Sequence, residues 1–138
     1  MNALMTSLYL VLANDATLLA TATGGVHLGQ APQGATYPLV EVRAQDVDRP
    51  TKVLGGGDAF RQHLVLVKGI VADTKTGSQP AACGTLDARF DTLLDNVTLT
   101  ISGRSHMFTQ RESSIFYPED GADATYWHCG GVFRIWDQ

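Results

Sequence analysis

The chain has 138 residues, of which 44% are apolar, so it is long enough for a single domain with a hydrophobic core over residues 1–138. Its formal net charge is −4 and its 10 Lys and Arg residues form no run, which argues against a nucleic-acid-binding surface built on excess positive charge. Two cysteines are too few for a disulfide scaffold.

The N-terminal segment predicts an amphipathic helix over residues 2–13, because leucine and valine recur there at helical spacing. No Lys or Arg precedes this apolar run, so we do not expect a secretory signal, and no run reaches the ~20 apolar residues of a membrane span. Asp15 is expected to cap a short second helix. A short strand over residues 26–28 and a loop ending at Tyr37-Pro38 follow.

The longest predicted strand covers residues 58–73, and a shorter strand over 39–44 is expected to pair with it in antiparallel fashion. The middle of the long strand is apolar on both faces, with Leu64, Leu66 and Ile70 alternating with Val65, Val67 and Val71. Such a strand lies inside a sheet that is covered on both sides. In a chain this short, a second subunit is one candidate for covering the other face of the sheet.

The connection between these two strands, Gln45–Gly57, is predicted to be a long loop with Gly55–Gly57 as a flexible hinge. Hairpin loops usually have about 2–5 residues, and longer loops in compact domains are usually functional or disordered. The glycines lack the Gly-Lys-Ser/Thr continuation of a phosphate-binding loop. The simpler alternative is a solvated hairpin tip.

A second long helix is predicted after Ser78, which can cap it, with Pro80 in its first turn and Asn96 at its end. Its apolar residues form one stripe, which should cover one face of the sheet: Cys83, Leu86, Phe90, Leu93, Leu94 and Val97.

Three more strands are predicted towards the C-terminus, over residues 98–101, 106–117 and 126–136. A turn over 118–121 separates the last two. The order of helix, strands, helix and strands indicates an α+β fold, with a largely antiparallel sheet on which the N-terminal and central helices pack.

The sequence offers no convincing catalytic, cofactor or metal site. The four histidines lack the spacing of zinc ligands: His27, His63, His106 and His128. Ser113-Ser114 lacks the context of a nucleophile elbow. Cys83 and Cys129 lie in apolar patterns, so we expect them to be packed, reduced thiols in a protein made in the cytosol.

Aromatic residues are concentrated near the C-terminus of the chain. Alternation along the last strand assigns Trp127 and Phe133 to the core face. The opposite, more polar face carries Tyr126, His128, Arg134 and Trp136. Exposed Trp, Tyr and Arg are enriched at protein interfaces, so this face is a candidate interaction surface, and packing within the subunit is the alternative.

In order along the chain, these patterns resemble the tail completion, or tail terminator, proteins of long-tailed bacteriophages. The resemblance covers nearly the whole chain. It rests on the helical segment 7–12 followed by Asn14-Asp15-Ala16, on the Ala31-Pro32-Gln33-Gly34 motif within 26–40, on the central helix, and on the closing strand 126–135. His128 and Cys129 depart from the family pattern before the glycines.

The resemblance implies a structural, non-enzymatic virion subunit without a cofactor. Such subunits form a ring, usually a hexamer, on the head-proximal end of the tail tube, where they stop tube polymerisation and join the tail to the head–neck connector. DNA passes through the centre of the ring. A mildly acidic bore would let DNA slide, because like charge removes the attraction for phosphate.

The expected contacts with neighbouring subunits or the tube fall on the long loop and on the polar face of the last strand: Arg43, Asp46, Asp48, Arg49, Lys52, Tyr126, His128, Arg134 and Trp136. Two alternatives remain open. One is another neck protein, such as a head-completion or stopper subunit, and the other is a small ligand-binding or enzymatic α+β domain.

Overall fold

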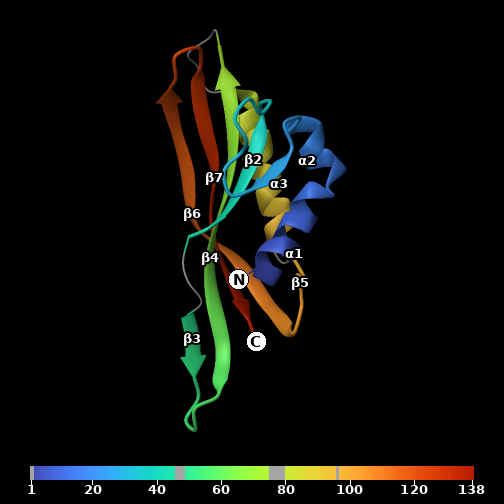
Figure 1. Cartoon of the computed structure of the whole chain (residues 1–138), viewed down its shortest axis with the longest axis vertical. Coiled ribbons are helices and arrows are strands. Elements are labelled where there is room, and N and C mark those ends of the chain that lie inside the picture. Colours follow the sequence, from blue (N-terminus) through green and yellow to red (C-terminus); the bar gives the residue numbers. More distant parts are fainter. Residues whose placement is uncertain (1, 46–48, 75–79, 96) are drawn as a thin grey trace.

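The computed structural model describes residues 2–45, 49–74, 80–95 and 97–138 (Figure 1). Its elements in chain order are α1 (Asn2–Ala13), α2 (Ala16–Thr21), β1 (Val26–Leu28), β2 (Leu39–Ala44), β3 (Arg49–Lys52), β4 (Asp58–Asp73), α3 (Ala81–Leu94), β5 (Thr100–Ile101), β6 (Arg104–Asp120) and β7 (Thr125–Asp137). Helices and strands are both present, so the predicted α+β class is confirmed.

The strands form one strongly curled sheet in the order β1-β2-β4-β7-β6-β5, and β3 pairs with the outer part of β4 (Figure 1). The pairings of β4 with β2, β3 and β7 are antiparallel, as are those of β6 with β5 and β7. β1, however, runs parallel to β2. The sheet is therefore mixed. The predicted antiparallel pairing is confirmed for the pairings named above, but not for β1 with β2.

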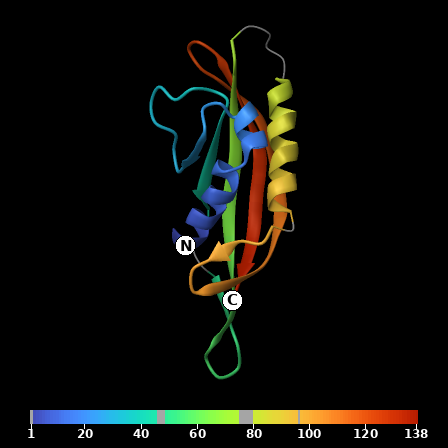
Figure 2. The ribbon, with the colours of Figure 1, turned by 90° about the vertical axis from the view of Figure 1, so that its right-hand side faces the viewer.

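All three helices lie on one face of the sheet (Figure 2). The core between the helices and the sheet contains fully buried leucines of α1 and α3 with valines of β2 and β4, among them Leu8, Leu12, Leu86, Val42 and Val67. Burying a side chain of this size contributes roughly 1.5–3 kcal/mol relative to leaving it exposed. Packing therefore holds these helices on the sheet more than helix propensity does.

The middle of β4 is buried on both faces, as its sequence predicts. Val65 and Val67 belong to the helix-covered core, whereas Leu66, Lys68 and Ile70 alternate with them on the opposite face and are at most 8% exposed. We call this opposite side of the sheet the helix-free face. Part of its cover comes from the chain itself, because the loop before β2 folds over this face at Lys68 and Ile70.

Glycine allows two close approaches in this sheet. A Cβ at Gly69 would lie 2.8 Å from Leu86 Cδ1, so the glycine lets α3 pack directly on β4. Gly130 has φ +129° and its Cβ would lie 2.2 Å from the Val67 carbonyl oxygen, so only glycine fits there.

The predicted N-terminal elements agree with the structure. The helix over 2–13 is α1, and Asp15 caps α2, since the Leu18 N–H donates to Asp15 Oδ1 at 2.7 Å. The predicted strands over 26–28, 39–44 and 58–73 are β1, β2 and β4.

Three details differ from the sequence prediction. The stretch Gln45–Gly57 contains a strand, β3, so its described residues outside this strand are Gln45 and the tip around Val53–Gly57. The turn falls after Asp120, because Pro118 continues β6. This part of β6 lies beyond its pairing with β5 and has β7 as its described partner, so a missing N–H costs little there. Pro80 is the N-cap of α3 and precedes its first turn. Ser78 and Asn96, the predicted cap and stop of this helix, lie outside the described residues.

Candidate assembly surface

The helix-free face carries the predicted contact residues of the last strand. Tyr126, His128, Arg134 and Trp136 alternate along β7 with residues that face the helices, and each meets a partner on a neighbouring strand. The structure thus places all four on one face, as the alternation predicts. Their role in contacts with other subunits stays a prediction.

An aromatic pair marks the end of this face near the C-terminus. The rings of Phe108 and Trp136 stack with centroids 4.1 Å apart and an interplanar angle of 19°. Phe108 is 45% exposed, so the pair presents apolar surface to solvent. The Arg134 guanidinium carbon lies 5.7 Å from the centroid of the Trp136 ring. Trp and Arg are the residue types that most often dominate binding energy at protein interfaces.

Arg134 also links three neighbouring strands. It donates two hydrogen bonds to Glu112 of β6, from Nε at 2.6 Å and from Nη2 at 2.7 Å, and a third to Gln62 Oε1 of β4 at 2.9 Å. The hydrogen bond from Arg134 lowers the pKa of the Glu112 carboxyl. This bidentate pair holds the guanidinium beside the aromatic pair in one orientation.

His128 lies farther along the same face and is only 5% exposed. Its ring stacks on Tyr117 with centroids 4.6 Å apart, and its Nε2 lies 2.8 Å from Glu119 Oε2. Burial, followed by the nearby Lys68 ammonium, lowers the pKa of His128. The imidazole is therefore neutral near pH 7 and donates from only one nitrogen.

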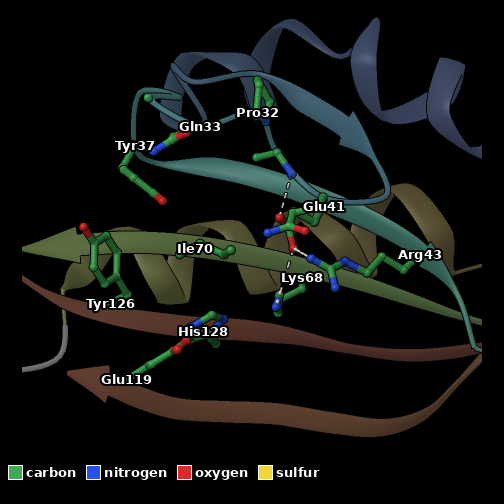
Figure 3. A pocket seen from close by; sticks show the side chains of 13 residues that line it. Pro32, Gln33, Tyr37, Glu41, Arg43, Lys68, Ile70, Glu119, Tyr126 and His128 are labelled. Carbon is green, nitrogen blue, oxygen red and sulfur yellow. Dashed lines mark hydrogen bonds and ion pairs between the residues drawn. The ribbon is translucent and has the colours of Figure 1, made fainter. Parts of the chain in front are cut away.

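Beside His128 the helix-free face is hollowed, and the hollow has a volume of about 600 Å³ (Figure 3). Glu41 forms its centre, accepting from Arg43 Nη2 at 2.7 Å and from the Ala31 N–H at 2.9 Å. Arg43 Nε also donates to the Gly29 carbonyl oxygen at 3.3 Å. Glu41 and Arg43 thereby fasten the loop before β2 to the sheet.

Sequence reasoning missed the buried charges of this hollow. Glu41 is 3% exposed and Lys68 8%, yet β-alternation alone assigns Glu41 to a solvated face. The pairing of these two charges could be predicted only from the register between β2 and β4, in which Glu41 and Lys68 are direct partners. Opposite charges placed directly across two strands favour each other. Arg43, predicted to act with the loop residues, belongs to this hollow.

β3 and the first part of β4 form a two-stranded arm, residues 49–62, that projects beyond the body of the sheet (Figures 1 and 2). At its tip Leu54 is fully exposed and Val53 is half exposed. Gly55 and Gly56 have φ of +112° and +94°, angles that close the tip. Asp58 accepts from Lys52 and, at 3.1 Å, from Arg61, and these bonds lower the pKa of Asp58.

The contact residues predicted for the loop region thus lie in two places, the hollow, which contains Arg43, and the arm. Lys52 lies on the arm, and the backbone of Arg49 starts β3. Asp46 and Asp48 lie outside the described residues. The arm and the turn after β6 occupy opposite ends of the long axis of the molecule (Figure 1).

A buried histidine–carboxylate contact lies at the base of the arm, and no spacing in the sequence indicates it. His63 Nε2 is 3.0 Å from Asp137 Oδ2, both side chains are inaccessible to solvent, and Arg104 Nη1 donates to the same oxygen at 3.2 Å. This contact fastens β4 to the end of β7 at the point where the arm leaves the sheet.

The described residues contain no cluster of three or more His, Cys, Asp or Glu side chains that could hold a metal ion. Among them, too, no helix is both long and apolar enough to cross a membrane. Cys83 and Cys129 are buried free thiols.

Comparison with known proteins identifies the fold. No model of a known protein family matches the chain, and neither does any curated protein. A chain from the virion of a native gene transfer agent (GTA) particle has the same fold, with 20% identity and a TM-score of 0.72 over 99% of this chain and 95% of that one. A second solved structure matches with 12% identity and a TM-score of 0.58 over 99% and 93% of the two chains.

Proposed function

We propose that the protein is a structural subunit of a phage-like virion, and more specifically a tail terminator. The observation that carries the proposal is the shared fold with a GTA virion chain over nearly the full length of both chains. The order of sequence motifs that resembles tail completion proteins supports the same assignment. In this role the subunit forms a ring, six copies in the simplest case, on the head-proximal end of the tail tube.

The two exposed features of the subunit suit a ring that must make different contacts on different sides. The arm presents Leu54 and Val53 beyond the body, and the helix-free face presents the Phe108–Trp136 pair with Arg134. Two unlike surfaces on one subunit give a head-to-tail interface, which closes into a ring when the rotation between copies allows it. The arm of one copy would then bind the helix-free face of the next copy.

In this proposal the protein is not an enzyme, and DNA passes through the ring without specific binding. The net charge of −4 per chain supports passage of DNA rather than tight binding of DNA, because attraction to phosphate requires excess Lys and Arg. The protein would work through geometry, by occupying the end of the tube and leaving no free site for another tube subunit.

The test is particle assembly in a producing strain that lacks the protein, examined by electron microscopy. A terminator predicts unjoined heads together with tails of irregular length, and restoration of both when the gene is supplied. Tails of normal length that fail to join heads would contradict termination and favour a head-completion or stopper subunit. Normal particles would refute a virion role altogether.

A second measurement distinguishes a virion subunit from a small ligand-binding domain. A reconstruction of the neck should show the subunit as a closed ring at the end of the tube. A single copy or an open filament there would contradict the proposal.

A further inference from the structure

The two cysteines of the chain are neighbours in the core between α3 and the sheet. Cys83 of α3 is 1% exposed and Cys129 of β7 is 2% exposed. Burial is the main cause of the raised pKa of both thiols, and a hydrogen bond between the two side chains also acts on both pKa values. Two elements that are distant in the sequence therefore bring their sulfur atoms into contact.

Gly69 of β4 makes room for this contact. It is the direct partner of Cys129 across β4 and β7, and the Cys129 S–H donates to its carbonyl oxygen at 3.6 Å. A Cβ at Gly69 would lie 2.8 Å from Leu86 Cδ1 and 3.1 Å from Cys129 Sγ. Cys83 lies one turn before Leu86 in the buried stripe of α3. The missing side chain of Gly69 thus lets α3 and β7 meet through these residues.

The two thiols differ in how readily they lose a proton. Cys83 lies in the first turn of α3, where the backbone N–H groups of a helix favour a thiolate. Burial raises the pKa of Cys129 to a greater extent than that of Cys83. Cys83 is therefore the sulfur that reacts first with an oxidant, and Cys129 is placed to react with the product.

We propose that Cys83 and Cys129 form a redox site, at which a peroxide converts the two thiols into a disulfide that joins α3 to β7. The Cys83 sulfur attacks one oxygen of hydrogen peroxide, the O–O bond breaks, and the other oxygen leaves as water with the Cys83 proton. The Cys129 sulfur then attacks the resulting sulfenic acid. The S–S bond forms as the S–O bond breaks, and a second water leaves with the Cys129 proton. Two thiols are oxidised and one peroxide is reduced.

The disulfide would join the central helix to the middle of the sheet by a covalent bond. Such a cross-link stabilises a protein mainly by restricting the unfolded chain, and more so when it closes a long segment, as the one between α3 and β7 is. A reducing compartment keeps the pair as thiols, whereas an oxidising one favours the cross-link. The proposal does not depend on the virion role, and its tests use the purified full chain.

The first test is a peptide map after treatment of the folded protein with hydrogen peroxide. After removal of the peroxide, free thiols are alkylated in denaturant and the chain is digested with trypsin. The tryptic peptides 76–89 and 112–134 should be linked through Cys83 and Cys129, and reductant should separate them. Met107, which is 49% exposed, reports by its oxidation that the peroxide was active.

Two results of this map would overturn the proposal. One is sulfinic or sulfonic acid at Cys83 while Cys129 is still alkylated, because it would show that the second sulfur does not reach the first. The other is full alkylation of both cysteines under conditions that oxidise Met107.

Thermal unfolding tests whether the cross-link fits the native packing. The oxidised wild type should melt at least about 5 °C above the reduced protein, and reductant should remove the difference. Cys83→Ala and Cys129→Ala, each compared with itself before and after peroxide, should show no gain that reductant reverses. Met107→Leu keeps the thiol pair and is the matched control, so it should gain as much as the wild type.

A cross-linked wild type that melts at the same or a lower temperature would contradict the proposal, since the bond would then strain the contact between α3 and β7. If one alanine variant does not fold, the other variant and the wild-type peptide map still decide the outcome. A reductant-sensitive gain in either alanine variant would refute the assignment to this pair.

Discussion

The Arg89 guanidinium of α3 donates two hydrogen bonds to the Asp15 carboxylate, from Nε at 2.9 Å and from Nη2 at 2.6 Å. The same carboxylate caps α2 by accepting from the Leu18 N–H. One side chain thus starts one helix and fastens it to another. We expect Asp15→Ala to lower the free energy of unfolding by about 1–3 kcal/mol, because it removes a cap and a charge-assisted pair. Urea unfolding measures this, with Asp95→Ala, at the exposed C-cap of α3, as a control of little effect.

This pair also predicts a pH dependence. The hydrogen bond from Arg89 holds the pKa of Asp15 below its ordinary value of 3.8. A lowered folded-state pKa gives stability that is fully present above 3.8 and is lost as the pH falls through the folded-state pKa. The difference in stability between wild type and Asp15→Asn should therefore be constant near neutral pH and shrink in acid. A difference that grows as the pH falls would contradict the pairing.

Arg111 joins the central helix to the edge of the sheet. It donates to Asp91 Oδ1 at 2.7 Å, to Asp87 Oδ1 at 2.9 Å and to the Gly130 carbonyl oxygen at 3.1 Å. Arg111→Met keeps much of the packing and removes these bonds, so we expect a loss of about 1–3 kcal/mol in the free energy of unfolding. Asp91→Asn, which alters a more exposed partner, should cost less. If Arg111→Met and Asp91→Asn lowered the free energy of unfolding equally, the hydrogen bond to the Gly130 carbonyl would contribute little.

The two cysteines should be slow to react in the folded protein. Burial raises the pKa of the Cys83 thiol and, to a greater extent, that of the Cys129 thiol, so little thiolate forms near neutral pH. Titration with a thiol reagent should find two thiols per chain in denaturant without reductant and almost none on the same timescale in buffer. Finding no thiols in denaturant would indicate a disulfide and contradict the prediction.

The arm and the aromatic pair can be tested separately in assembly. Leu54→Ser changes a fully exposed side chain, so it should leave the unfolding midpoint unchanged and reduce the joining of tails to heads. Trp136→Ala should reduce joining too, with a modest loss of stability from its stacking on Phe108. Thr51→Ser, also on the exposed arm, is the matched control. If Leu54→Ser and Thr51→Ser particles join equally well, the tip makes no essential contact.

Replacing Gln45–Gly57 with a short Asn-Gly turn is a harsher version of the arm experiment. We expect a folded body that cannot join tails to heads. The replacement also removes β3, so a folded variant must first be demonstrated by circular dichroism. Full infectivity with this variant would make the segment only a tether and assign the assembly contacts to the helix-free face.

Much of the fold could be predicted because local patterns agree with tertiary packing. Valine and leucine alternate along β4, and Asp15 stands where a cap is needed, so single residues indicate their environment. β3 was missed because Pro50, Gly55 and Gly56 weaken the strand pattern, and its pairing with β4 decides its structure.

The site was harder to predict than the fold. Tyr126, His128, Arg134 and Trp136 share a face that alternation defines. The buried pair of Glu41 and Lys68 depends on the register between β2 and β4 and on the loop that folds over them. Neither can be obtained from periodicity within one segment, because both are properties of segments far apart in the sequence.

β4 runs without interruption from the arm to the opposite end of the body, where Asp73 pairs with Thr125 beside the turn between β6 and β7. At roughly 3.3 Å per residue, its 16 residues span about 50 Å. The buried His63–Asp137 pair fixes the strand to the body where the arm begins. The length of β4 therefore fixes the distance between the tip of the arm and the turn between β6 and β7. If each end bound a different partner, the separation of the two partners would depend on the number of residues in this one strand.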